Sequence, residues 1–227
     1  MNSPRAGQPF WERPDIAERF ANRQPDKRMQ ALLQDQPRTL HVLDIGCAGG
    51  RNSVWLVEAG FDVHAVDASQ AMIAKTRERL APLLGSTEAE RRVLNTRMDD
   101  LAMFDDNSFD LALALGVFQE AQSEAVWHAA VSEAARVLKT GAQLLVAHFS
   151  PDSDPTGKGL NLVAEEQHLY TGFPGHPRTL LYADEIDAWM ARHGLEPLEP
   201  TESVRVTFEK GYRTTVNGLY RKQFGEN

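Results

Sequence analysis

The stretch HVLDIGCAGGRNSVWLVEAGFDVHAVD, residues 41–67, limits most strongly the fold that the chain can adopt. It contains an apolar run, a turn of small residues, a helical pattern and a second apolar run that ends in Asp67. Two short strands joined by a helix form a βαβ unit, and such units build parallel sheets. A glycine-rich turn after the first strand offers backbone amides and a helix N-terminus to a nucleotide-like ligand. The stretch therefore predicts an α/β fold with such a ligand at this turn.

The alternation of apolar runs and helical patterns continues beyond this stretch. The spacing predicts strands over 41–46, 62–67, 92–97, 109–116 and 142–149. The helices expected between them cover 51–59, 69–84 and 122–139, and Ser69 is an expected N-cap. Gly60, Gly85 and Gly141 each follow a helical pattern, where a left-handed residue commonly ends a helix. This order is typical of a doubly wound, mostly parallel sheet.

The C-terminal third has a different texture. Residues 150–180 are rich in Pro, Gly and His and show little periodicity. A loop of that length in a compact domain is usually a lid or a binding segment. A helix over 183–193 and two strands over 203–209 and 214–221, joined by a hairpin turn at 209–212, are expected after it. The hairpin predicts an antiparallel strand at the end of the sheet.

Composition excludes several classes of protein. The 227 residues carry a net charge of −8, whereas a protein that binds phosphate backbones usually has a basic balance, so no nucleic acid is expected. The single cysteine, Cys47, excludes an intramolecular disulfide and a cysteine-cluster metal site, and the cytoplasm is the expected location. The first residues lack the apolar core of a secretory signal. The longest apolar run, 111–118, is far shorter than the roughly 20 residues of a membrane helix, so no membrane partner is expected.

The turn itself discriminates between nucleotide-like ligands. In a dinucleotide frame, G-x-G-x-x-G starting at Gly46, Ala48 and Arg51 occupy the second and third glycine positions. The frame D-x-G-x-x-x-G fits better, with Asp44, Gly46 and Gly50. An acid in the turn repels a pyrophosphate but suits a cofactor with an ammonium and a sulfonium group. The charges therefore favour S-adenosylmethionine (SAM) over NAD or FAD.

Four sequence blocks resemble the class I SAM-dependent methyltransferases. VLDIGCAGGRNS resembles their motif I, V-L-D-x-G-C-G-x-G, with Ala48 in place of a glycine. RMDDL resembles the adenine clamp, FDDNSFDLALALGVF the block that leads into the fourth strand, and EAARVLKTGAQLLVAHF the helix–turn–strand block that follows. The four lie in family order within residues 40–149. The resemblance implies a Rossmann-like fold with a mostly parallel seven-stranded sheet, an antiparallel C-terminal strand and helices on both faces.

The resemblance also implies which residues hold the cofactor. Asp67 would bind the ribose hydroxyls, Asp99 the exocyclic amine and Leu115 the methionine portion. The residues expected at the cofactor are Asp44, Gly46, Cys47, Ala48, Gly50, Asn52, Asp67, Ala68, Met72, Met98, Asp99, Leu115 and Gly116. A structural role for Asp44, anchoring the turn amides, stays open. Cys47 is expected to be a small apolar turn residue and not a nucleophile.

The methyl acceptor is expected to be a small molecule. The segment after the fourth strand reads Leu115-Gly116-Val117-Phe118 instead of the D/N-P-P-Y/F pattern of the adenine- and cytosine-type amino methylases. The cysteine nucleophile of the pyrimidine C5 methylases is missing as well. Only Glu120 lies close by for a metal ion, so no metal is expected. A looser resemblance to the tellurite-resistance-type branch rests on GRNS, VFQEAQ, Phe173-Pro174 and Arg221-Lys222.

Few acceptor-side residues are obligatory, because in-line displacement at a sulfonium depends mainly on positioning. His148 and His176 are candidates for a general base, and Arg178 is a candidate for binding an anionic acceptor. The remaining acceptor-side candidates are Phe10, Trp11, Phe20, Phe118, Gln119, Glu120, Phe149, His168, Tyr170, Phe173 and Tyr182. Packing of a lid is the alternative role for the aromatic residues.

The sequence thus predicts a SAM-dependent methyltransferase of small molecules, monomeric or homodimeric. The alternatives are a SAM-binding or assembly subunit without activity and, disfavoured by Asp44 and Arg51, an NAD or FAD oxidoreductase. The expected division is an N-terminal helical cover (1–37), a SAM-binding core (38–150), a lid or substrate-side insertion (151–182) and a C-terminal helix and hairpin (183–227).

Overall fold

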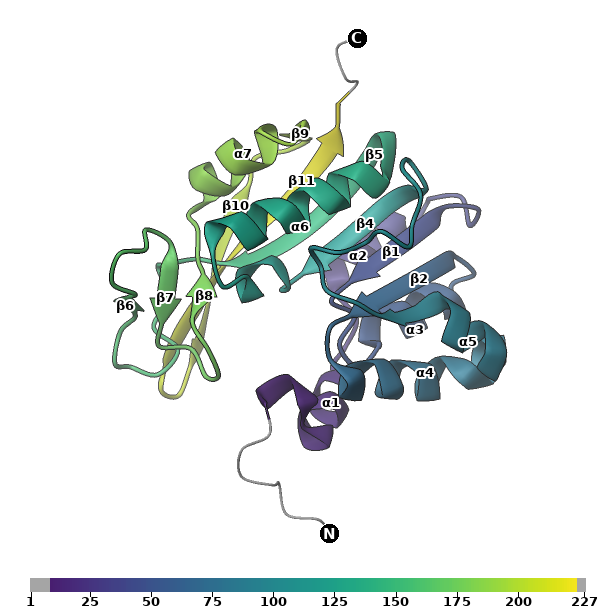
Figure 1. Cartoon of the computed structure of the whole chain (residues 1–227), viewed down its shortest axis with the longest axis horizontal. Coiled ribbons are helices and arrows are strands. Elements are labelled where there is room, and N and C mark those ends of the chain that lie inside the picture. The colour runs from purple at the N-terminus through teal and green to yellow at the C-terminus, as the bar shows by residue number, and fades with distance from the viewer. Residues whose placement is uncertain (1–8, 224–227) are drawn as a thin grey trace. The chain divides into compact units, whose positions relative to one another are not determined.

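The computed structural model describes residues 9–223 of the chain (Figure 1). Two compact units make up this part, residues 9–98 with 109–111 and residues 99–108 with 112–223. Strand β4 (Phe109–Leu115) has residues in both. Within residues 9–223 no helix is both long and apolar enough to cross a membrane.

The first unit is built on parallel strands β1 (His41–Ile45), β2 (Asp62–Asp67) and β3 (Val93–Asn95), which lie in the order β1-β2-β3. The first residues of β4 lie beside β1, where the backbone N–H of His41 donates to the Asp110 carboxylate at 2.9 Å. Because the strands are parallel, the C-terminal ends of β1 and β2 meet at one edge. The apolar runs expected over 41–46 and 62–67 therefore form strands as predicted, whereas β3 is shorter than expected.

Three helices pack on this sheet: α3 (Arg51–Glu58), α4 (Gln70–Leu84) and α5 (Ser86–Arg92). The Ser69 hydroxyl accepts from the backbone N–H of Met72, so Ser69 is the N-cap that the sequence predicts. Between helices and sheet lies a cluster of buried residues, formed by Cys47, Ala65, Ile73, Leu80, Ala89 and Val93.

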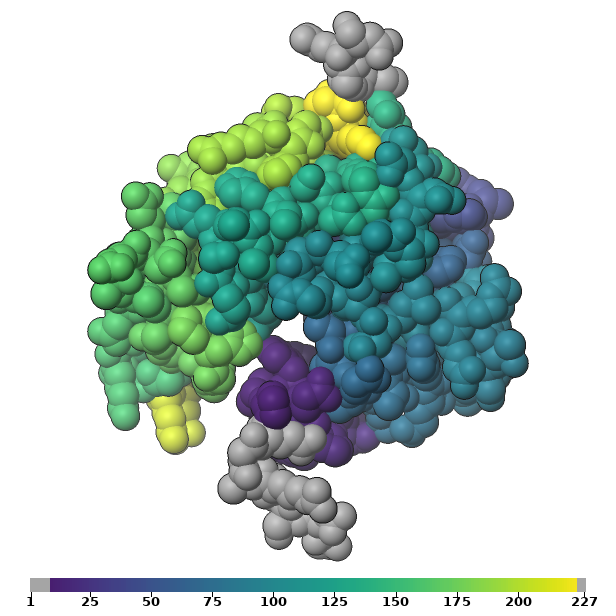
Figure 2. Space-filling model, in the orientation of Figure 1, coloured from purple at the N-terminus to yellow at the C-terminus, as the bar shows by residue number. Residues whose placement is uncertain are grey.

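Short helices precede β1, as the helical spacing of the first residues indicates: η1 (Phe10–Glu12), α1 (Pro14–Ala21) and α2 (Lys27–Leu33). Glu12 accepts from the backbone N–H groups of Gln70 and Ala71, and the Ser69 hydroxyl donates to the carbonyl of Trp11. Helix α1 also contacts α4, and the two are neighbours in Figure 2. The N-terminal segment is thus fastened to the N-cap and first turn of α4, which begins three residues after Asp67.

The second unit continues from β4 to β5 (Leu138–Phe149), β11 (Gly211–Lys222) and β10 (Glu202–Phe208), in that order. Strand β11 runs antiparallel to both β5 and β10, which confirms the expected antiparallel C-terminal strand. A further strand, β9 (Leu195–Pro197), pairs with the end of β11 and was not expected. Helices α6 (Glu124–Val137) and α7 (Ala183–Ala191) belong to this unit.

One boundary differs from the prediction. Helix α6 ends at Val137 and β5 begins at once at Leu138, so Gly141 lies inside a strand and does not end a helix. Its φ of 80° explains why glycine occupies this position.

The Pro- and Gly-rich stretch is more regular than its composition suggests. It forms a small antiparallel sheet of β6 (Asn161–Leu162), β7 (Leu169–Thr171) and β8 (Arg178–Thr179). Thr179 fastens β8 to the end of η2 (Phe118–Glu120): its backbone N–H and its hydroxyl both donate to the carbonyl of Ala121, at 3.2 and 3.0 Å. The insertion is therefore anchored to the segment that directly follows β4.

Candidate cofactor and acceptor sites

The turn between β1 and α3 owes its shape to left-handed residues. Gly46, Ala48 and Gly50 have φ values of 71°, 51° and 77°. The backbone N–H groups of Gly46 and Cys47 both donate to the carbonyl of Val66, at 2.8 and 3.0 Å, so the turn is held against the end of β2. A Cβ on Gly49 would lie 2.7 Å from atoms of Ala17 and Ala21. The sequence did not single out Gly49, whose need for glycine depends on a distant helix.

Asp67 ends β2 and lies against this turn. Its carboxylate accepts from the backbone N–H groups of Ala48 and Ser69, each at 2.9 Å. Burial raises the pKa of Asp67 to about 6, because these hydrogen bonds offset only part of the lost hydration. A carboxylate has about four acceptor positions, so two remain for hydroxyl donors. Asp67 thus has the place and the capacity of a ribose ligand.

Asp44 is a second desolvated carboxylate in the same unit. It is buried in β1 and accepts from the Ser53 hydroxyl at 2.6 Å. This side-chain hydrogen bond differs from the anchoring of turn amides that the sequence left open as a structural role. Burial raises the pKa of Asp44 to about 6, against the opposing effects of Ser53 and Arg51. The charge of Asp44 also contributes to raising the pKa of Asp67. Two such carboxylates favour a cationic ligand and disfavour a pyrophosphate.

The other cofactor candidates of the first unit surround the turn. Burial raises the pKa of the Cys47 thiol well above its usual value, which fits a small apolar turn residue. The Asn52 side chain accepts from the backbone N–H of Asp26, and Met72 is buried against Ile16. Ala68 is exposed between Asp67 and the N-cap of α4. The unit thus brings the turn and Asp67 together.

The candidates after β3 and β4 are divided between the two units. Met98 is the last residue of the first unit before β4, whereas Asp99, Leu115 and Gly116 belong to the second. The backbone N–H of Gly116, whose φ is 92°, donates to the carbonyl of Ala147 at 2.9 Å. This bond holds the end of β4 against β5.

Glu120 is the centre of the acceptor-side candidates in the second unit. Its Oε1 accepts from Nε of Arg178 at 2.7 Å, and its Oε2 lies 2.9 Å from Nε2 of His176. Burial by itself would raise the pKa of Glu120, but the hydrogen bond from His176 and the charge of Arg178 outweigh it and lower the pKa. Two residues that the sequence singled out, His176 and Arg178, therefore meet at one carboxylate.

Arg178 lies beside aromatic rings, and its hydrogen bonding is incomplete. The Arg178 side chain is 5% exposed, and its Nη1 is buried without a hydrogen-bond partner in the described part of the chain. The ring of Phe173 lies 5.3 Å from the guanidinium carbon and stacks on Phe149, with centroids 5.1 Å apart. The Oε1 atom of the neighbouring Gln119 is likewise buried and unpartnered among the described residues.

His148 occupies a different environment from the one expected of a base. It is fully buried in β5, its Nε2 accepts from the indole N–H of Trp127 at 3.1 Å, and its Nδ1 lies 2.9 Å from the carbonyl of Phe149. Burial lowers the pKa of His148 to about 4, against weaker opposing effects of that carbonyl and of Glu120. With both nitrogens engaged, the neutral ring is suited to holding β5 against α6.

The remaining acceptor-side candidates are dispersed. His168 lies between two carboxylates, with Nδ1 2.6 Å from Glu124 and Nε2 3.3 Å from Glu185, and so bridges α6 and α7. Tyr182 precedes α7 and is exposed. Phe10, Trp11 and Phe20 pack together in the first unit.

Comparison with known proteins agrees with these observations. Residues 42–141 match the methyltransferase domain family. A ubiquinone biosynthesis O-methyltransferase of Xanthomonas axonopodis pv. citri is 25% identical over 163 residues, which are 71% of this chain and 64% of that relative. The chain thus spans somewhat less than two thirds of the length of this relative.

Solved structures share the fold. A SAM-dependent methyltransferase of Methanosarcina mazei gives a TM-score of 0.66 at 19% identity, covering 86% of this chain and 98% of that one. The 1,6-didemethyltoxoflavin N1-methyltransferase of Burkholderia thailandensis, solved with S-adenosylhomocysteine, gives 0.63 at 20% identity, covering 92% and 79%. The Rossmann-like fold and the family resemblance expected from the sequence are confirmed. Residues 42–141 thus match a methyltransferase domain, as the resemblance to the class I SAM-dependent methyltransferases implied.

Proposed function

We propose that this protein transfers a methyl group from SAM to a small-molecule acceptor. The observation that carries the proposal is the pair of desolvated carboxylates, Asp44 and Asp67, at the glycine-rich turn of the first unit. A cationic, ribose-containing cofactor supplies a positive charge to Asp44 and hydroxyl donors to Asp67. The name of the Xanthomonas relative supports an acceptor oxygen.

The residues of this chain have mainly binding and positioning roles in the proposal. Asp67 accepts from the ribose hydroxyls, and Asp44 and the turn amides face the amino acid end of the cofactor, with the other expected cofactor residues around them. Bound SAM supplies a methyl group on a sulfonium, which the acceptor displaces in line. His176 is the proposed base for an acceptor that must lose a proton, because His148 has both ring nitrogens engaged.

The segments around the core are assigned by the same reasoning. Residues 9–37 are proposed as the cover of the cofactor side, and residues 151–182 as the acceptor side. The first eight residues of the expected N-terminal cover and the last four of the C-terminal segment lie outside the described residues. The acidic balance of the chain supports an acceptor other than nucleic acid.

Calorimetry with SAM and transfer of labelled methyl test the proposal in sequence. Wild-type protein is expected to bind SAM, and Asp67→Ala is expected to weaken binding about 10- to 100-fold, the effect of losing hydrogen bonds to a charged group. No binding at millimolar SAM contradicts the proposal. Binding without methyl transfer to any of a broad panel of small molecules indicates the inactive subunit, and a fluorescence change with NADH indicates an oxidoreductase.

A further inference from the structure

Arg178 is a buried arginine whose hydrogen bonding is incomplete. Nε donates to Glu120, yet Nη1 has no partner within residues 9–223 and no access to water. A buried charged donor without a partner is costly, and native structures rarely leave one unexplained. The position is therefore suited to a group that is present when the protein functions.

The charges around Arg178 indicate the kind of group. Glu120 balances the guanidinium, and His176 lies against the second oxygen of the same carboxylate. Once His176 has taken the proton of an acceptor hydroxyl, these three side chains carry one net positive charge. The cluster thus offers a positive charge to an anionic group of the acceptor at the stage when the hydroxyl proton has been transferred.

The neighbouring aromatic side chains indicate the shape of the group. Phe173 covers the guanidinium and stacks on Phe149, the last residue of β5, with an interplanar angle of 17°. Gly172 and Gly175, with φ values of 120° and 106°, flank Phe173 and Pro174. Since Nη1 is buried, a ligand reaches it only when a neighbouring group moves, and the two glycines leave the backbone on either side of Phe173 and Pro174 free of Cβ restriction. The planar fork of a guanidinium matches a planar oxyanion such as a carboxylate.

We propose that the acceptor is a hydroxyl compound with an anionic, carboxylate-like group, that Arg178 binds this group and that His176 takes the hydroxyl proton. Glu120 is the positioning residue that holds both. The inference rests on the proposed methyltransferase function. The hydroxyl proton passes to Nδ1 of His176, and the oxygen uses the electron pair of the O–H bond to form the new bond to the methyl carbon. The electron pair of the S–CH₃ bond stays on sulfur, and the proton then leaves His176 for solvent.

Matched probe pairs test the anion site directly. Protein saturated with S-adenosylhomocysteine is titrated with 3,4-dihydroxybenzoate and with 3,4-dihydroxybenzamide, and then with 2-hydroxy acids and their amides. At least one acid is expected to bind about 10- to 100-fold tighter than its amide, as a charged hydrogen bond requires. Arg178→Gln is expected to remove this preference and to leave binding of the amide and of S-adenosylhomocysteine unchanged.

The chain offers a matched control for Arg178. Arg136 is another arginine of the second unit with a carboxylate partner, and Arg136→Gln is expected to keep the acid preference. Equal binding of acids and amides by the wild type overturns the inference, as does a preference that survives Arg178→Gln or the failure of every acid to bind. Because SAM binding is measured separately, loss of that binding counts against the proposed function, whereas SAM binding without acid preference counts only against this inference.

The positioning role of Glu120 has its own readout. A carboxylate that orients the base acts on the methyl-transfer step, so Glu120→Gln is expected to lower kcat more than it raises KM, and Glu120→Asp is expected to restore part of kcat. His176→Gln is expected to keep the acid preference and to lose methyl transfer. Equal losses of activity in Glu120→Gln and Glu120→Asp, in step with their losses of stability, indicate a structural role alone and overturn this part of the inference.

Discussion

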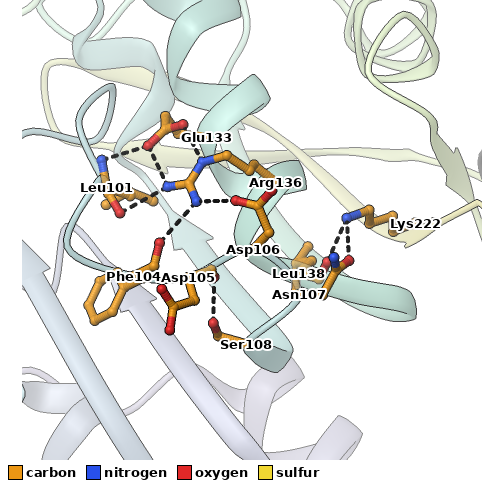
Figure 3. Close-up of polar contacts among 10 residues, drawn as sticks. All are labelled: Leu101, Phe104, Asp105, Asp106, Asn107, Ser108, Glu133, Arg136, Leu138 and Lys222. Atoms are coloured by element: carbon orange, nitrogen blue, oxygen red, sulfur yellow. Dashed lines mark hydrogen bonds and ion pairs between the residues drawn. The ribbon is translucent and has the colours of Figure 1, made fainter.

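Two arginines of the second unit each pair with a glutamate, but their hydrogen bonding differs. Arg136 uses all three nitrogens: Nε and Nη2 donate to Glu133, Nη1 to Asp106 and to the carbonyl of Phe104, and Nη2 also to the carbonyl of Leu101 (Figure 3). Arg178 donates to Glu120 through Nε and leaves Nη1 buried and without a partner among the described residues. The first arrangement is complete and the second is not.

Burial makes the difference meaningful. The Arg136 side chain is 28% exposed, so water can complete any bond that the protein omits, whereas the Arg178 side chain is 5% exposed. Arg136 fastens the segment between β3 and β4 to α6, a structural task that needs no ligand. The hydrogen bond missing at Nη1 of Arg178 cannot be supplied by bulk water, because that atom is buried. This is the physical basis for treating Arg178 as a binding group.

The largest expected effect is the loss of stability when each arginine loses its carboxylate. Glu120→Ala leaves a buried guanidinium unpaired and is expected to cost about 3–5 kcal/mol of unfolding free energy. Glu133→Ala exposes its arginine to water and is expected to cost about 1 kcal/mol. Urea denaturation of both variants measures the difference. Equal costs would mean that Arg178 finds another partner, and the contrast between the two arginines would fail.

Prediction of these features from sequence succeeds where the signal is local. The strand period, the glycine-rich turn and the acid that ends β2 are neighbours in the chain, and each formed as expected. The meeting of Glu120 with Arg178 joins residues 58 positions apart, and neither residue's neighbours encode it. The same holds for Gly49, which is restricted by α1, and for His148, whose partner Trp127 lies on α6. Local pattern indicates elements and turns, whereas tertiary packing decides which polar side chains share a partner.

An intermediate effect comes from comparing carboxylates instead of arginines. The hydrogen bond from His176 and the charge of Arg178 lower the pKa of Glu120, whereas burial raises the pKa of Asp44 and of Asp67 from 3.8 to about 6. A lowered pKa contributes stability that is lost as the pH falls through it. A raised pKa has the opposite sign, so the free protein loses stability as the pH rises from about 4 to about 6.

A cation at the turn reverses that loss, because it interacts with the ionised carboxylates. SAM is therefore expected to bind about tenfold tighter near pH 7 than near pH 5, since each unit of pKa shift corresponds to a factor of ten. Calorimetry at both pH values measures this change, and Asp67→Ala is expected to reduce it. An affinity that does not vary with pH would show that neither carboxylate titrates when the cofactor binds.

The smallest expected effect tests whether Arg136 is only structural. Arg136→Lys keeps the charge but cannot reproduce the planar fork that reaches Glu133, Asp106 and two carbonyls at once. We expect a cost of about 1 kcal/mol in urea denaturation, in the range of a partly exposed ion pair, with unchanged affinity for SAM and for acid probes. Salt is expected to weaken the wild-type contribution of Arg136, because exposed charges are screened. A change in acid affinity in this variant would show that the two arginines are coupled, and the division into one structural and one binding arginine would then be wrong.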